Sequence, residues 1–361
     1  MLEHKSDFGK LDLEFLQQII DATKEVVAKR IHKTSLSNFT ISSIAICSRL
    51  YYYYFMNDCL TEERKIAKFN SINLNESANV IADITYEIIN QRNKTLNSGI
   101  NAFSELSFTI EATLVFYINL IEPFSKTNPY ESLMPDMFLK VFRQALGLLR
   151  MLNLDLASEG YSNWRTLHEA ECVIKLLVEG GEPLQKVYLR HIDYNSAFRN
   201  GLSSKEETDK IFVEIKANMA KHGLKSKDMK KYIEYGFLYA CKTYDESNVD
   251  YKLNFRNGLQ KAARLEEYNA WYEMASEMAH SSPIFFYSNT AFFADLTAVN
   301  LTDITLRLIN YFEEYLKSNT KISYHGKELE KDMLIKNLEA QTKLGDDKFY
   351  TKYKDYLNDE E

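Results

Sequence analysis

Arg165 and Glu169 stand four positions apart in a segment with helical spacing, which places their side chains on the same face of a helix. An arginine suits recognition of a phosphate group because its planar guanidinium can donate to two oxygens at once. A glutamate one turn away can orient that guanidinium. The pair therefore predicts a helix face on which Arg165 acts as a phosphate or transition-state clamp and Glu169 holds it in place.

A second segment carries Tyr272, Ser276 and His280, whose spacing of i, i+4 and i+8 forms one polar stripe along a helix. Histidine exchanges protons near neutral pH, so His280 is the candidate general base or acid. The surrounding residues are small or apolar, and an unpaired polar group in a helical core is costly. We therefore expect this stripe to face Arg165 and Glu169, so that all five side chains converge.

These two segments together resemble a known family. The run from Trp164 to Glu169 is followed about a hundred residues later by the run from Tyr272 to Pro283, and this pattern resembles the domain of unknown function 5677. The resemblance covers roughly residues 139–316. It implies an all-helical bundle in which an R-x-L-x-E helix packs near a Y-x3-S-x3-H helix. The family carries no assigned reaction, so the resemblance implies a fold and a site without a chemistry.

Bundles of this kind are similar to the larger group of HEPN proteins, many of which are ribonucleases in toxin–antitoxin and phage-defence systems. Their usual signature is an arginine, four to six residues, and then a histidine on one helix. This chain departs from that signature, since only two residues separate Arg165 from His168 and no arginine stands at the right distance before His280. A nuclease site would require Arg165 and His280 to meet across helices.

The leading functional hypothesis is a ribonuclease-like or nucleotide-binding protein of stress or phage defence, with RNA or a nucleotide as its partner. As an enzyme it would be a hydrolase that needs neither metal nor cofactor. The catalytic residues in this hypothesis are Arg165, Glu169 and His280, and the binding residues are Tyr272, Ser276 and His168.

Two alternatives remain open. The same cluster could fix how two helices dock in a non-enzymatic interaction module, whose partner is another protein or a second copy of the chain. Glu277 and His280 also have the E-x-x-H spacing of di-iron carboxylate bundles, with Glu169, Glu171 and Glu273 as loose further candidates. Such sites need two E-x-x-H motifs and two more glutamates, and only this one stands in a matching context, so we expect no metal.

The elements that position these residues are expected to be helices throughout. Twelve glycines and five prolines are few for 361 residues, whereas strand-rich folds use many tight turns. The 24 tyrosines and 21 phenylalanines are expected to fill the space between helices. We predict an all-α multi-helix bundle with an N-terminal helical region (1–130), a helical bundle domain (131–320) and a charged helical tail (321–361).

Within this bundle, Gly180 and Gly181 are expected to stop a helix that begins near residue 163, and Pro183 to start the next one. A further long helix is expected over residues 255–280, which carries the Tyr272 stripe.

Charge and hydropathy restrict the location and the partners. A net charge of −7 disfavours broad, non-specific nucleic-acid binding. Residues 221–227, which with Lys230 and Lys231 form the densest positive cluster, are expected to be a solvated loop. The two most apolar stretches, residues 41–60 and 106–121, both carry charges, so we expect no membrane span. The N-terminus lacks the apolar segment of a signal peptide, and the four cysteines have no C-x-x-C pair. These features predict a cytoplasmic protein with reduced thiols.

Overall fold

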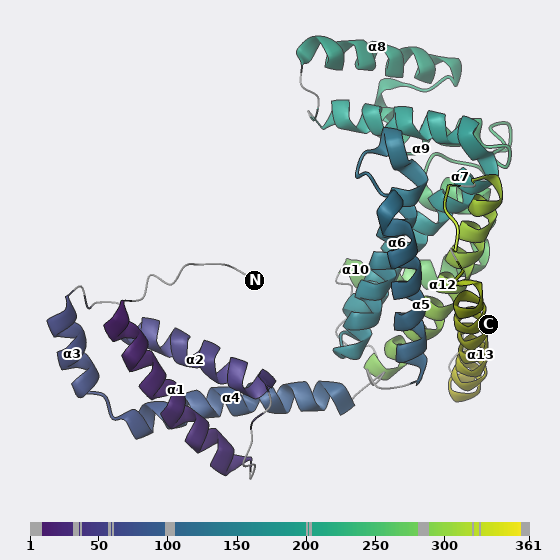
Figure 1. Ribbon diagram of the computed structural model, residues 1–361. Coiled ribbons are helices and arrows are strands. Elements are labelled where there is room, and N and C mark those ends of the chain that lie inside the picture. The colour runs from purple at the N-terminus through teal and green to yellow at the C-terminus, as the bar shows by residue number, and fades with distance from the viewer. Residues whose placement is uncertain are drawn as a thin grey trace. The chain divides into compact units, whose positions relative to one another are not determined.

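The computed structural model describes residues 9–31, 36, 38–56, 59, 61–97, 105–199, 201, 204–280, 289–319, 321–324 and 326–354. Over these ranges the chain forms helices and turns and no strand, which confirms the predicted all-α class (Figure 1). The chain divides into two compact units, residues 1–97 and 98–361, which are described separately. None of the helices in the described ranges is long and apolar enough to cross a membrane.

The first unit contains α1 (Lys10–Arg30), α2 (Asn38–Met56), α3 (Glu62–Asn70) and α4 (Leu74–Asn97). Helix α1 packs against α2 and α4, and Ile19, Tyr52 and Ile81 are buried between them. The buried carboxylate of Asp12 accepts hydrogen bonds from the Tyr52 hydroxyl and, at 2.7 Å, from Lys65 Nζ. The first unit therefore has a hydrophobic core of its own.

The second unit is built around α7 (Ala157–Phe198) and α12 (Thr290–Ser318), which pack along each other. The other long helices are α5 (Glu105–Ile121), α6 (Pro129–Asn153), α8 (Lys205–Lys221), α10 (Asn269–Ala279) and α13 (Glu328–Lys352). Short elements link them: η1 (Glu122–Phe124), η2 (Ser226–Asp228), α9 (Met229–Tyr235), η3 (Gly236–Ala240), the π turn η4 (Phe255–Gln260) and η5 (Glu266–Tyr268). Aromatic rings fill the core as expected, including Tyr117, Phe142 and Phe312, which stack or meet edge to face.

Helix α7 bends sharply at Gly181, whose φ of 60° and ψ of −159° are not helical. We call the bend the elbow, residues 157–180 the first arm and residues 182–198 the second arm. Only glycine adopts this backbone conformation without a steric penalty. Pro183 lies at the start of the second arm, where its missing N–H costs little. The predicted break at this glycine pair is confirmed, and helix α8 lies along the second arm beyond it (Figure 1).

The prediction of a single helix over residues 255–280 is wrong for the first half of this range. The structure has the π turn η4, then Arg264 with a φ of 56°, then the 3-10 turn η5, and α10 begins only at Asn269. Asn254 caps the π turn by accepting from the Asn257 N–H at 2.8 Å. Apolar spacing alone does not reveal such a change of helix type. The interruption brings the side chains of η4 toward the first arm of α7.

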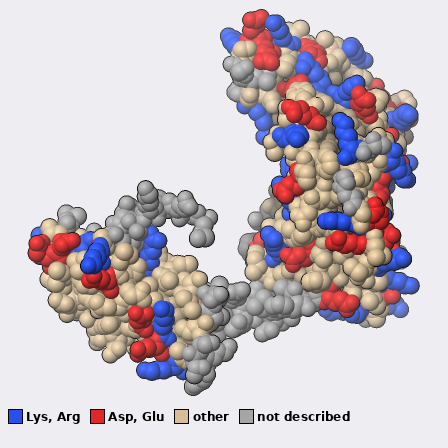
Figure 2. Space-filling model, viewed as in Figure 1, with Lys and Arg blue, Asp and Glu red and all other residues tan. Residues whose placement is uncertain are grey.

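The basic segment near residue 225 is solvated as expected, since Lys225, Lys227, Lys230 and Lys231 are all exposed. Figure 2 shows Lys and Arg interspersed with Asp and Glu over the visible face of the second unit. That face presents no extended basic surface. The four cysteines are free thiols, and Cys47, Cys172 and Cys241 are buried.

Candidate functional site

The first arm of α7 and helix α10 bring together Arg165, Glu169 and Tyr272. Arg165 Nε donates to Glu169 Oε1 and to the Tyr272 hydroxyl, both at 3.2 Å. The Tyr272 hydroxyl in turn donates to Glu169 Oε1 at 2.5 Å, and the guanidinium lies 5.4 Å from the centre of the Tyr272 ring. We call these three residues the arginine cluster. Glu169 and Tyr272 therefore hold the guanidinium of Arg165 through its Nε.

The other edge of Arg165 is open. Its terminal nitrogens, Nη1 and Nη2, have no hydrogen-bond partner among the described residues, and 26% of the side chain is exposed. Burial disfavours the charged form, but the hydrogen bonds and charges of Tyr272 and Glu169 outweigh it and raise the pKa of Arg165. The cluster therefore presents a permanent cation with a free donor fork.

Ser276 and His280 lie farther along α10. Ser276 is half-buried, and His280 is exposed at the helix end, where its backbone N–H donates to Ser276 O and Glu277 O. Eight residues of helix separate Tyr272 from His280, a rise of about 12 Å. No described interaction joins the His280 side chain to Arg165. Ser281, Ser282 and Pro283 lie outside the described residues.

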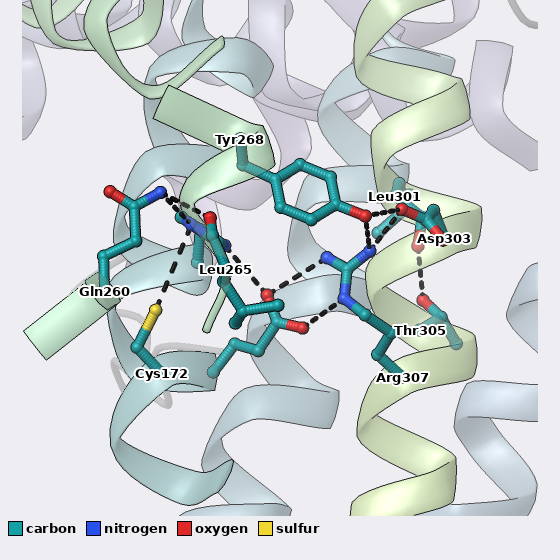
Figure 3. Close-up of polar contacts among 10 residues, drawn as sticks. Cys172, Gln260, Leu265, Tyr268, Leu301, Asp303, Thr305 and Arg307 are labelled. Atoms are coloured by element: carbon teal, nitrogen blue, oxygen red, sulfur yellow. Dashed lines mark hydrogen bonds and ion pairs between the residues drawn. The ribbon is translucent and has the colours of Figure 1, made fainter. Parts of the chain in front are cut away.

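His168, which has no exposed surface, belongs to a different cluster with Gln260, Tyr268, Asp303 and Arg307, which Figure 3 labels. Its Nδ1 lies 2.8 Å from Glu171 Oε2, and its Nε2 lies 3.1 Å from Gln260 Nε2. Gln260 Nε2 also donates to the Leu265 carbonyl at 2.9 Å, so this atom is the amide nitrogen. His168 Nε2 must then accept, which leaves Nδ1 to donate to Glu171. This histidine is a core residue whose two ring nitrogens both have partners.

Arg307 completes that cluster from α12. Its Nε donates to Glu171 Oε1 at 2.5 Å and its Nη2 to Glu171 Oε2 at 3.1 Å. Its Nη1 donates to Asp303 and to the Tyr268 hydroxyl, and its guanidinium lies 4.3 Å from the Tyr268 ring centre. We call His168, Glu171, Tyr268, Asp303 and Arg307 the buried ion network. It ties α7 to α12 and η5 through charge-assisted hydrogen bonds.

The buried ion network sets the charge of Glu171, which has no exposed surface. Burial by itself would raise the pKa of this carboxyl. The charge of Arg307 and the hydrogen bonds from His168 and Arg307 overcome that effect and lower the pKa instead. Glu171 is therefore an anion with no exposed surface, and its charge depends on these partners.

A cavity of about 330 Å³ lies inside the elbow, beside the arginine cluster. Side chains from both arms of α7, from α9, from η3 and from the π turn line it, and we call it the elbow cavity. Its walls include the aromatic rings of Tyr188, Tyr235, Phe237 and Phe255. Glu169 belongs to both the cavity wall and the arginine cluster. Phe255 joins the two as well, because its ring stacks on Tyr272 at 4.2 Å.

A histidine that the sequence pattern did not identify, His191, lines the elbow cavity. His191 is 6% exposed, and its Nδ1 lies 3.1 Å from the Ile233 carbonyl, which can only accept. Burial lowers the pKa of His191, against the smaller effect of this hydrogen bond. Nε2 is then an unprotonated acceptor, and no described residue donates to it. Gly236 leaves room for the ring, since a Cβ there would lie 2.7 Å from His191 Cε1.

A larger hollow, of about 600 Å³, lies between the start of α6 and the second arm. Its charged side chains include Lys126, Lys186 and Lys321, which are all exposed. It contains none of the arginine cluster, so its size alone does not make it the better candidate site.

The carboxylate metal site finds no support in the described part of the chain. No group of three or more His, Cys, Asp or Glu side chains there is placed to hold an ion. Glu277 and His280 are both exposed, and Glu273 pairs with Arg256 at 3.2 Å. Glu169 and Glu171 belong to two different clusters.

Comparison with known proteins relates part of this chain to a family of unknown function. Residues 133–294 match the model of a family described as a family of unknown function (DUF5677). The matched segment includes the arginine cluster and the elbow, and the predicted resemblance to this family is confirmed over it. Neither the curated proteins nor the solved structures contain a match.

Proposed function

We propose that this protein binds a nucleotide at the elbow, with Arg165 holding the phosphate and the elbow cavity holding the base. One observation carries the proposal. The guanidinium of Arg165 is anchored through Nε, while Nη1 and Nη2 have no described partner, and Glu169, which anchors it, also lines an aromatic cavity.

The anchoring of Arg165 favours an anionic ligand. Glu169 and Tyr272 hold the side chain before any ligand arrives, so little conformational entropy is lost on binding. The free donor fork matches two oxygens of a phosphate group. The neighbouring carboxylate of Glu169 neutralises part of the charge, so the cluster accepts an anion while remaining stable without one.

The elbow cavity favours a planar group attached to that anion. Its volume of about 330 Å³ lies within the roughly 300–1,000 Å³ of small-molecule sites. Four aromatic rings line it, and stacking of a base on an aromatic side chain contributes roughly 1–3 kcal/mol. A phosphate on the arginine cluster and a base in the adjoining cavity together describe a nucleotide.

The charge distribution favours a mononucleotide over a nucleic-acid polymer. The net charge is −7, and acidic side chains interrupt the basic ones over the face shown in Figure 2. A polymer needs many phosphate contacts along a basic path. One open arginine beside one cavity suits a single phosphate ester.

The Arg165→Ala variant is expected to bind a nucleoside monophosphate at least about tenfold more weakly, because a charge-assisted hydrogen bond to phosphate is lost. Isothermal titration with the four common nucleoside monophosphates and their unphosphorylated nucleosides measures this. The nucleosides should bind the wild type and the variant equally. Arg256→Ala, which removes an exposed arginine paired with Glu273, is the matched control and should bind like the wild type. Equal binding by Arg165→Ala, or no binding by the wild type at millimolar nucleotide, counts against the proposal.

The ribonuclease hypothesis and the HEPN-like resemblance remain predictions, and the hypothesis depends on His280 as the general base or acid. Because His280 is exposed and two helical turns from Tyr272, His280→Ala is expected to keep both the melting temperature and the nucleotide affinity of the wild type. Thermal unfolding and titration test this directly. Cleavage of a single-stranded RNA by the wild type that disappears in His280→Ala would instead support the nuclease.

A further inference from the structure

Three side chains, Glu169, His191 and Glu234, place hydrogen-bond acceptors on the wall of the elbow cavity. Glu234, at the end of α9, contributes a carboxylate whose nearest described cation is Lys230 at 4.0 Å. His191 contributes Nε2, and Glu169 contributes Oε2, which has no described partner. No lysine or arginine is among the side chains that line the cavity. A ligand group seated against Glu169, His191 and Glu234 can therefore donate N–H hydrogen bonds to them.

We propose that the base bound in the elbow cavity is guanine, with Glu234 as the residue that selects it. This inference rests on the proposed nucleotide function and adds the identity of the base. Guanine carries N1–H and the N2 amino group side by side, so one carboxylate can accept from both in a bidentate pair. Adenine and cytosine place an acceptor beside their amino group, and uracil places its single N–H between two carbonyl oxygens.

Other polar groups in the cavity match the remaining hydrogen-bonding groups of guanine. His191 is 6% exposed and its Nε2 has no described donor, so this nitrogen can accept the second hydrogen of the N2 amino group. Burial lowers the pKa of His191, so this nitrogen stays an acceptor at neutral pH. Asn195 Oδ1 already accepts from Arg199 Nε at 2.8 Å, which leaves Asn195 Nδ2 to donate to guanine O6. The aromatic walls then cover the faces of the purine.

A carboxylate also accepts hydrogen bonds from an organic cation, so the experiment must distinguish a bound cation from a bound base. A cation such as spermidine would use Glu169 and Glu234 with the aromatic rings and would leave Arg165 unused. A guanine nucleotide uses both the cavity and Arg165. The two ligands therefore differ in their dependence on Arg165.

The test compares guanosine, inosine and adenosine monophosphates by titration against the full-length wild type, Glu234→Gln and Glu267→Gln. The wild type should bind guanosine monophosphate at least about tenfold more tightly than inosine monophosphate, which lacks only the N2 amino group, since one oxygen of the Glu234 carboxylate and His191 Nε2 then lose their donors. Glu234→Gln should lose this preference and keep its melting temperature, because Glu234 is 36% exposed. Glu267 is exposed and outside the cavity wall, so Glu267→Gln should behave like the wild type.

The outcomes separate the two proposals. Binding of all three nucleotides with equal affinity, still dependent on Arg165, overturns the guanine assignment and leaves the nucleotide function standing. Absence of any nucleotide binding overturns both. Spermidine that binds the wild type with no dependence on Arg165, while guanosine monophosphate does not bind, identifies the cavity as a cation site and overturns the guanine assignment. If Glu234→Gln retains the guanine preference, Glu234 is not the residue that selects the base.

Discussion

The Arg307→Ala variant is expected to lose roughly 3–5 kcal/mol of unfolding free energy, the usual cost of leaving one partner of a buried ion pair uncompensated. Glu171 has no exposed surface, and Arg307 donates to both of its carboxylate oxygens. Removal of the guanidinium leaves this anion with only His168 as a donor among the described residues. Urea denaturation followed by circular dichroism measures the loss.

Two further variants show whether the buried charge is the cause. Arg307→Ala combined with Glu171→Gln should recover part of the loss, because glutamine is neutral and its oxygen can still accept from His168. Arg256→Ala breaks an ion pair whose side chains are 49% and 55% exposed, and it should cost no more than about 1 kcal/mol. A loss below about 1 kcal/mol for Arg307→Ala itself would show that the buried ion network does not stabilise the fold through this charge.

The second large effect is expected at Gly258, in the π turn. A Cβ at this position would lie 2.2 Å from the Lys252 carbonyl oxygen, which is backbone and has no flexible side chain to move aside. Gly258→Ala is therefore expected to cost about 3 kcal/mol, at the upper end of ordinary overpacking. It should also weaken nucleotide binding, because Phe255 and Leu259 of the same turn line the elbow cavity. Thermal unfolding and titration measure the two effects.

Gly147 provides the matched control for this substitution. It lies within α6, and a Cβ there meets no atom within 4 Å. Gly147→Ala should stabilise the protein by roughly 0.5–1 kcal/mol, because alanine loses less entropy in a helix than glycine does. If Gly258→Ala unfolds within about 0.5 kcal/mol of the wild type, the close approach of Lys252 is not a constraint on the turn.

Local spacing predicted the parts of this protein that depend on near neighbours. The scarcity of glycine and proline predicted an all-helical chain, and the pair Gly180–Gly181 predicted the break in α7. Arg165 and Glu169 were found because they stand one helical turn apart. The cost of leaving two polar stripes unpaired in a core predicted their meeting with Tyr272. The same argument placed Ser276 and His280 in the cluster, and no described interaction joins either of them to Arg165. The π turn was missed, because its conformation depends on the Asn254 cap and on close packing rather than on periodicity.

The remaining site residues depend on contacts that spacing does not encode. His191 is positioned by a carbonyl 42 residues away, and Glu171 by an arginine 136 residues away. A helical pattern shows which face a side chain shares, but it does not show which distant helix covers that face. Asp303 and Arg307 do stand four apart, and His168 and Glu171 three apart, so each half of the buried ion network had a local signal. Their pairing became visible only with the helices packed.

The elbow has a consequence for the order in which the chain folds. Ala170 and Val173 on the first arm and Tyr188 and Ile192 on the second face the same cavity, yet they lie within about twenty residues of sequence. Closing so short a loop costs little chain entropy, whereas Arg307 must close a loop of 136 residues to reach Glu171. Contacts of low sequence separation form early and non-local ones form late. During synthesis the two arms therefore can form this wall of the cavity before α12 has emerged, and the buried ion network then locks a bend that already exists.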